Sequence, residues 1–319
     1  MTNITIEKIK HLDNKPPSFK KIVYPEPVKE HIQRPFYVCC SIGARGSGKS
    51  YSVVKMILNQ EDSGFINPTT GGKCDIRTII FSPTLENNPI FNTIKSLDDD
   101  DKYDGFSEDK LSEILEELKE ERAYAKEYNH YVSVYKKYKK MSEKEFSRWT
   151  DKEAVLLLYA YDFIDPNDLE KPKHEHGLIC NIIFDDVLSD KNAFSNKKGS
   201  ILNKLVLNGR HYMANVFICG QSLKSITRLI RLNTQVWILF SFKSQKVILD
   251  DLYDLVSGVV TEDEFIKLYE YATKDNHNAL VIDEKDNCEK GIVFKRNFDE
   301  ILRRGVEKND IKKYKDIQI

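Results

Sequence analysis

Short apolar runs alternate with stretches of helical spacing along most of this chain. The apolar runs are rich in β-branched and aromatic residues, and we expect strands at residues 36–42, 77–84, 155–161, 178–184, 216–220, 236–242 and 278–282. Helical patterns lie between several of them, including residues 51–58, 198–207 and 261–272. Strands that alternate with helices predict an α/β fold, a mostly parallel sheet covered by helices on both faces.

A charged segment at about 98–151 interrupts this alternation. Its helical pattern leads into a row of tyrosines with alternating spacings of four and three, followed by lysines: Tyr124, Tyr128, Tyr131, Tyr135 and Tyr138, then Lys136, Lys137, Lys139 and Lys140. One interpretation is a helical insertion whose tyrosine and lysine face meets nucleic acid or another subunit. The other, which we favour, is an amphipathic helix or hairpin that packs on its own domain with solvated lysines.

The pattern predicts one large domain with two flanking segments. Residues 1–34 contain lysines and prolines in weak patterns and read as an N-terminal arm, whereas residues 35–290 form the α/β domain with its insertion. Residues 291–319 read as a basic C-terminal tail.

Composition narrows the picture only slightly. The chain has 319 residues and a formal net charge of −1, so any contact with nucleic acid must come from local basic patches. Six scattered cysteines without a C-x-x-C pair or ligand-spaced histidines indicate reduced thiols. No apolar run reaches the length of a signal peptide core or a membrane span, so we expect no membrane-spanning segment.

The most informative motif follows the first predicted strand. The residues match G-x-x-x-x-G-K-[ST] and are followed by a helical pattern: Gly43, Ala44, Arg45, Gly46, Ser47, Gly48, Lys49, Ser50 and then Tyr51. Such a loop cradles a polyphosphate with backbone N–H groups, while Lys49 reaches the β- and γ-phosphates and Ser50 binds Mg²⁺. The alternative is a glycine-rich turn between a strand and a helix.

Two adjacent acids end the apolar run 178–184. Asp185 is a candidate magnesium ligand, and Asp186 is a candidate base that orients or deprotonates the water attacking the γ-phosphate. The pair predicts ATP hydrolysis beyond binding, with ATP and Mg²⁺ as cofactors. The alternative is that the acids begin a turn and cap the next helix.

Three further polar residues complete the candidate site. Gln221 follows the strand 216–220, and because parallel strands end at the same edge of a sheet, it could sense the γ-phosphate and position water. Arg210 and Arg231 are candidates for an arginine finger donated to a neighbouring subunit, with a salt bridge or a DNA phosphate contact as the alternative for either.

These blocks resemble the poxvirus-type genome-packaging ATPases of large DNA viruses and virophages, in the FtsK–HerA superfamily of P-loop ATPases. The resemblance rests on the glycine loop, on Phe184-Asp185-Asp186, on Gly209-Arg210-His211 with 216–222, and on 229–233 before the strand 236–240. The stretch 261–283 also resembles the end of that family's domain. One departure is Asp186, where the wider superfamily often has the longer Glu.

The resemblance implies a RecA-like (ASCE) P-loop NTPase that forms a homo-oligomeric ring, a pentamer or a hexamer. Such a motor pumps double-stranded DNA into a capsid and works with capsid or portal-vertex proteins in the host cytoplasm, at the site of virus assembly, with the virion as a second location. Candidate DNA contacts are Lys197, Lys198, Lys224 and Arg228. The alternatives are another P-loop DNA translocase or helicase-like ATPase, and a P-loop kinase.

Overall fold

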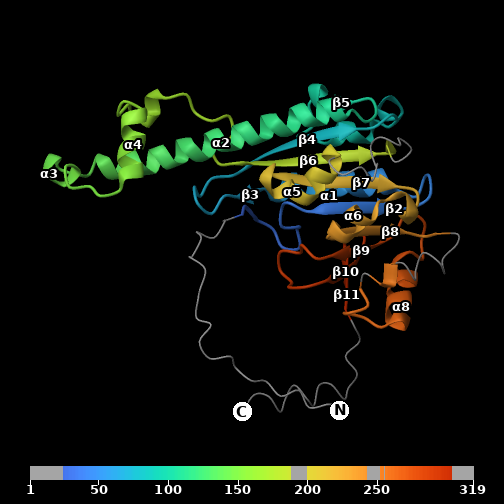
Figure 1. Cartoon of the computed structure of the whole chain (residues 1–319). Coiled ribbons are helices and arrows are strands. Elements are labelled where there is room, and N and C mark those ends of the chain that lie inside the picture. Colours follow the sequence, from blue (N-terminus) through green and yellow to red (C-terminus); the bar gives the residue numbers. More distant parts are fainter. Residues whose placement is uncertain (1–23, 188–199, 243–251, 255, 304–319) are drawn as a thin grey trace, which may run out of the picture.

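The structure is a computed structural model that describes residues 24–187, 200–242, 252–254 and 256–303. Its main body is a central sheet with helices on both faces, and a long helical arm projects from one side (Figure 1). The expectation of an α/β fold with a mostly parallel sheet is confirmed.

The α-helices are α1 (Lys49–Ser63), α2 (Glu108–Tyr138), α3 (Glu143–Phe146), α4 (Lys152–Ala160), α5 (Ile201–Asn208), α6 (Arg228–Asn233) and α8 (Glu262–Ala272). The strands are β1 (Glu26–Pro27), β2 (Val38–Ile42), β3 (Phe65–Ile66), β4 (Asp75–Phe81), β5 (Lys102–Tyr103), β6 (Leu178–Asp185), β7 (Ala214–Gly220), β8 (Val236–Phe240), β9 (Ala279–Asp283), β10 (Val293–Arg296) and β11 (Glu300–Leu302).

The main sheet has nine strands in the order β11-β10-β9-β8-β2-β7-β6-β4-β5. The six strands from β8 to β5 are parallel, whereas β9, β10 and β11 add to the β8 edge as antiparallel strands. The order places β7 between β2 and β6. The residue that follows β7 therefore lies between those that follow β2 and β6, and this arrangement builds the site described below.

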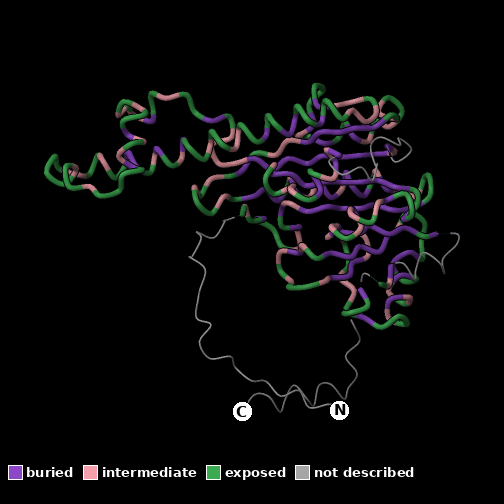
Figure 2. The backbone as a smooth tube through the Cα atoms, in the orientation of Figure 1, coloured by how far each residue is buried: buried purple, intermediate pink, exposed green. Residues whose placement is uncertain are grey.

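Helices cover both faces of the sheet, and alternate strand residues pack on the two sides. On β2, Val38, Cys40 and Ile42 join the core that also contains residues of α2, α5, α6 and α8, whereas Cys39 joins the core formed with α1. Every residue of β2, β6, β7, β8 and β9 is buried (Figure 2). This explains why the strands are continuous apolar runs rather than alternating patterns.

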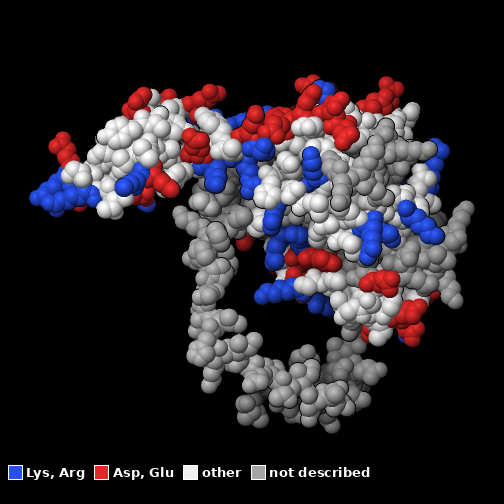
Figure 3. Space-filling model, viewed as in Figure 1, with Lys and Arg blue, Asp and Glu red and all other residues white. Residues whose placement is uncertain are grey.

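The charged insertion is a helical arm rooted on the sheet. The first half of α2 packs Leu111, Ile114, Leu115 and Leu118 into the main core. Its second half leaves the body and packs Tyr131, Val134 and Tyr135 against Ala154 and Leu158 of α4. Tyr131 is fully buried and its hydroxyl donates to the Ile164 carbonyl at 2.6 Å. The tyrosine seam therefore packs within its own domain, as the favoured interpretation predicted, while the lysines at the tip are exposed (Figure 3).

The predicted strand at 155–161 is wrong, because this segment forms α4. The run contains three consecutive leucines, which favour a helix as readily as a buried strand. The Asp151 side chain accepts a hydrogen bond from the Ala154 N–H at 3.2 Å and caps the helix. Ala154 and Leu158, four residues apart, then face α2.

The main sheet includes strands from beyond the domain boundary that the sequence indicated. β10 and β11 lie in the segment read as a tail and belong to the main sheet, because apolar residues such as Val293 and Phe294 are buried there. Of the predicted arm, residues 24–34 run along the domain, where Gln33 forms a β-bridge with Asp286. Among the described helices, none combines the length and the apolar composition needed to cross a membrane.

Candidate nucleotide-binding site

The glycine loop, the acid pair and Gln221 meet at one edge of the sheet. Ile42, the last residue of β2, pairs with Gly220 of β7, and Cys219 of β7 pairs with Asp185 of β6. The three strands therefore end side by side, and the residues that follow them open onto one cleft of about 590 Å³. A cleft of this size suits a small-molecule ligand.

The loop is shaped to present backbone N–H groups at the start of α1. Gly46 and Gly48 have φ angles of 75° and 107°, a region that residues with a side chain rarely adopt. No described side chain caps the N-terminus of α1, and its first turn contains no acidic residue. The N–H groups and the positive end of the helix dipole are thus available to an anion.

Lys49 lies at the centre of the loop. The residue is 7% exposed, and its Nζ donates to the carbonyl oxygens of Gly43 and Ala44 at 3.0 Å each. The Ser47 hydroxyl is buried without a hydrogen-bond partner among the described residues. A phosphate oxygen could accept from both groups, so the donors present fit a polyphosphate.

Substitution of Gly43 by alanine should displace the loop. A Cβ at this position would lie 2.4 Å from the Ser47 Oγ and 2.7 Å from the Phe240 Cβ, and the second atom cannot move without β8. We expect a loss of about 1–3 kcal/mol in the free energy of unfolding and at least a tenfold loss of nucleotide affinity. Denaturant unfolding and nucleotide titration measure the two effects.

Gly46→Ala is the matched comparison, since a Cβ there meets nothing within 4 Å and only the positive φ opposes it. Equal losses in the two variants would show that the close approach of Phe240 to Gly43 is unimportant.

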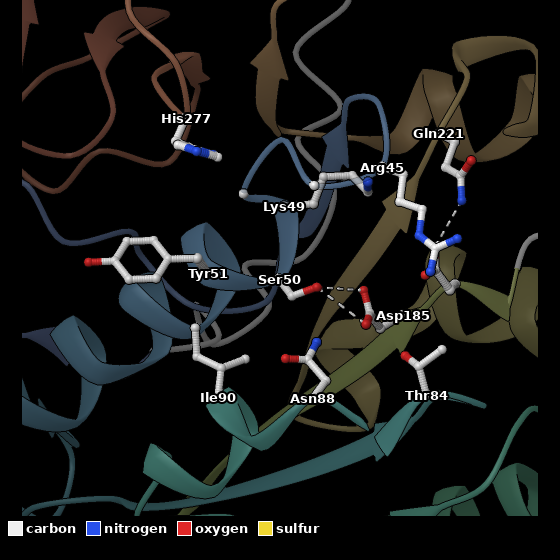
Figure 4. Close-up of a pocket in the computed structure, with 13 residues that line it drawn as sticks. Arg45, Lys49, Ser50, Tyr51, Thr84, Asn88, Ile90, Asp185, Gln221 and His277 are labelled. Atoms are coloured by element: carbon white, nitrogen blue, oxygen red, sulfur yellow. Dashed lines mark hydrogen bonds between the residues drawn. The ribbon is translucent and has the colours of Figure 1, made fainter. Parts of the chain in front are cut away.

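Ser50 and Asp185 bring a hydroxyl and a carboxylate together in the cleft. The Ser50 hydroxyl donates to the two carboxylate oxygens of Asp185 at 3.1 and 3.3 Å (Figure 4). Adjacent ligands of an octahedral Mg²⁺ lie about 2.9 Å apart and are oxygens, so the spacing and the chemistry of this pair fit the ion. Burial raises the pKa of Asp185, although hydrogen bonds from Cys219 and Ser50 oppose the shift. A bound cation would offset this burial and hold the carboxylate ionised.

Asp186 occupies an unusual backbone conformation. Its φ is 53°, in the left-handed region, whereas Asp185 is the last residue of the strand. The side chain of Asp186 therefore leaves the sheet beside Gln221, whose Nε2 donates to the Asp186 Oδ1 at 3.4 Å. Strained residues of this kind persist where surrounding structure holds them, which is common at functional sites.

Sequence reasoning missed several residues that line the cleft, namely Thr84, Asn88, Ile90 and His277. Thr84 follows β4, which pairs with β6, so the strand order would have located it. His277 is not close to the loop in sequence, yet its Nδ1 lies 3.4 Å from the Ser47 carbonyl oxygen. Figure 4 places Tyr51, Ile90 and His277 toward one end of the cleft and Asp185, Thr84 and Gln221 toward the other. Arg45 also lines it.

The remaining candidate cations do not line this cleft. Arg210 lies in the short 3-10 helix Gly209–His211, which precedes β7. It therefore lies at the amino end of this strand, whereas the cleft lies at the carboxyl end. Arg231 lies on α6, and its Nε is buried without a hydrogen-bond partner among the described residues. Lys224 and Arg228 are exposed, whereas Lys197 and Lys198 lie outside the described residues.

The sheet order and the loop before α1 define a P-loop NTPase fold of the RecA-like (ASCE) type, as the sequence predicted. No protein-family model and no curated protein matches the chain. Viral genome-packaging ATPases are among the solved structures that it resembles.

Three of these solved structures are described here. B204, the DNA-packaging ATPase from Sulfolobus turreted icosahedral virus, is 12% identical, with 78% of this chain and 93% of that chain covered and a TM-score of 0.39. B204 from Sulfolobus turreted icosahedral virus 2 in complex with AMPPCP is 12% identical, with 82% and 97% covered and a TM-score of 0.41. EssC (ATPases 2 and 3) from Geobacillus thermodenitrificans is 14% identical, with 95% and 50% covered and a TM-score of 0.44. At these identities and scores, the function is argued from the site itself.

Proposed function

We propose that this chain is an Mg²⁺-dependent ATPase that acts as a ring-shaped motor and moves double-stranded DNA into a capsid. The observation that carries the ATPase part is the hydrogen bond between Ser50 and Asp185, which joins the glycine loop to the acid pair. The viral packaging role rests on the resemblance of the sequence blocks to packaging ATPases.

The proposed roles follow from position in the cleft. The loop N–H groups and Lys49 hold the phosphates, and Ser50 and Asp185 hold Mg²⁺, which would supply charge neutralisation at the β- and γ-phosphates. Asp186 accepts a proton from the attacking water, and its contact with Gln221 orients the carboxylate. Gln221 lies where it can respond to the γ-phosphate.

Among the residues that the structure describes, Arg45 of the loop is the arginine that lines the cleft, and neither Arg210 nor Arg231 lines it. We therefore assign the transition-state arginine to a neighbouring subunit, with Arg210 and Arg231 as the two candidates. A ring follows from this assignment, because each site then needs the next subunit to be complete. In the family that the sequence blocks resemble, the ring has five or six subunits.

Subunit mixing tests this arrangement. A ring made only of Arg210→Ala or only of Arg231→Ala should be inactive if that residue is the finger. A ring made only of Lys49→Ala should be inactive because its glycine loop lacks the lysine that binds phosphate. Mixed rings combine an intact loop from the arginine variant with an intact finger from the Lys49 variant, so ATPase activity should return. Failure of both mixtures to recover activity, in rings of confirmed mass, would exclude a finger from either arginine.

DNA dependence separates a translocase from a P-loop kinase. A motor should hydrolyse ATP faster with duplex DNA and without a nucleoside acceptor, and its DNA affinity should fall steeply with salt and depend little on sequence. Displacement of a third strand from a DNA triplex reports movement along the duplex. ATP hydrolysis that is not stimulated by DNA and causes no strand displacement would agree with the ATPase assignment but contradict the motor assignment.

A further inference from the structure

We propose that Glu30, His31 and Cys288 form a zinc site that joins the N-terminal segment to the loop between β9 and β10. One donor atom from each of the three residues lies within 4.8 Å of the donors of the other two. Glu30 and His31 are adjacent in sequence, Cys288 lies far from them along the chain, and none of the three lines the nucleotide cleft. The proposal is therefore independent of the ATPase assignment.

The donor set selects the class of metal. A thiolate, an imidazole and a carboxylate are all ligands of Zn²⁺, whereas Mg²⁺ and Ca²⁺ prefer oxygen alone. Tetrahedral ligands at zinc distances lie about 3.3–3.8 Å apart. Small side-chain rotations at this exposed position would close the present spacing, and a water would complete the four ligands.

His31 is already oriented as metal-binding histidines usually are. Its Nδ1 lies 3.1 Å from the Oδ2 of Asp286, a carboxylate with no exposed side-chain surface. Because Nδ1 is engaged, Nε2 remains as the nitrogen for a metal. A carboxylate behind a ligating imidazole fixes the tautomer and the ring orientation and strengthens the ligand.

A buried cluster of ion pairs lies beside the proposed site. Lys295 is 3% exposed and contacts the carboxylates of both Asp283, at 2.8 Å, and Asp286, at 2.6 Å. The Lys295 ammonium also donates to the His31 carbonyl at 3.3 Å, so this cluster fixes the backbone beneath the proposed ligand.

The two segments are held together by contacts that do not involve the proposed ligands. The Arg34 N–H donates to the Lys285 carbonyl at 2.7 Å, and the Gln33 Nε2 donates to the Asp283 Oδ2 at 2.7 Å. His31 adopts a φ of 58°, which turns its side chain toward Asp286 at the cost of backbone strain. The fold thus brings the two segments together before any metal binds.

Zinc titration of the full-length chain tests the proposal, in a buffer with excess Mg²⁺ that occupies oxygen-only sites. We expect one zinc per chain by mass, at least a tenfold loss of affinity in Cys288→Ser and in His31→Gln, and a thiolate-to-metal charge-transfer band when Co²⁺ replaces zinc. Glu26→Gln, an exposed acid of the same segment, should bind zinc like the parent chain.

Thermal unfolding guards against misfolded variants. Without metal, Cys288→Ser and His31→Gln should melt close to the metal-free parent, and zinc should raise the melting temperature of the parent and of Glu26→Gln only. The proposal would be overturned if the parent chain took up no stoichiometric zinc. It would also be overturned if Cys288→Ser and His31→Gln bound zinc as tightly as the parent chain does.

Discussion

Lys49→Ala should abolish ATP hydrolysis, with a fall of at least about 100-fold in turnover. The ammonium group lies in the middle of the glycine loop, and no other lysine lines the described cleft. Its removal leaves the charge on the β- and γ-phosphates without this counter-charge in both the ground state and the transition state. Nucleotide affinity should fall as well, and phosphate release and nucleotide titration measure the two losses.

Lys55→Ala is the matched control. Lys55 lies on the same helix, but its Nζ points to the exposed carboxylate of Asp299 at 2.8 Å, a surface pair that contributes little to stability. Its turnover should remain within about twofold of the parent chain. Circular dichroism checks folding, since Lys49 also donates to two loop carbonyls. Normal turnover by folded Lys49→Ala would contradict the assignment of ATP hydrolysis to this cleft.

Asp186→Asn should retain ATP binding and lose turnover by about 100- to 10,000-fold, the range expected for a general base. The amide keeps the size of the side chain and can still pair with Gln221, but it cannot take a proton from water. Affinity for a non-hydrolysable ATP analogue should change little. Single-turnover hydrolysis, measured beside that affinity, separates the two effects.

Two further substitutions serve as controls for Asp186→Asn. Asp104→Asn neutralises an exposed carboxylate outside the cleft and should leave turnover unchanged. Asp186→Glu restores the carboxylate with one more methylene and should recover part of the activity lost in Asp186→Asn. If Asp186→Asn hydrolyses ATP at the parent rate, the base is another group.

The sequence was most informative where one interaction dominates. Strands buried on both faces are apolar throughout, so β6, β7, β8 and β9 were recognisable from composition alone. The loop at 43–50 was recognisable because phosphate binding demands particular residues at fixed spacing. Both predictions needed only local sequence.

The sequence predictions were wrong or incomplete where contacts between distant residues determine the structure. The run 155–161 is apolar enough for a strand, but it forms a helix that is capped by Asp151 and packs against α2. His277 and Thr84 reach the cleft through the order of the strands, which the sequence does not state. Likewise, Glu30 and Cys288 come together only because the N-terminal segment runs along the end of β9.

The length of α2 would turn a small rotation at its root into a large displacement of its tip. Arg77 of β4 contacts Asp101 and Glu117, and so ties the helix to the strand that neighbours β6, where Asp185 lies. From Leu118, the last residue of α2 in the main core, to Tyr138 the helix rises about 30 Å. A rotation of about 10° at the root would therefore carry the lysine-bearing tip through about 5 Å.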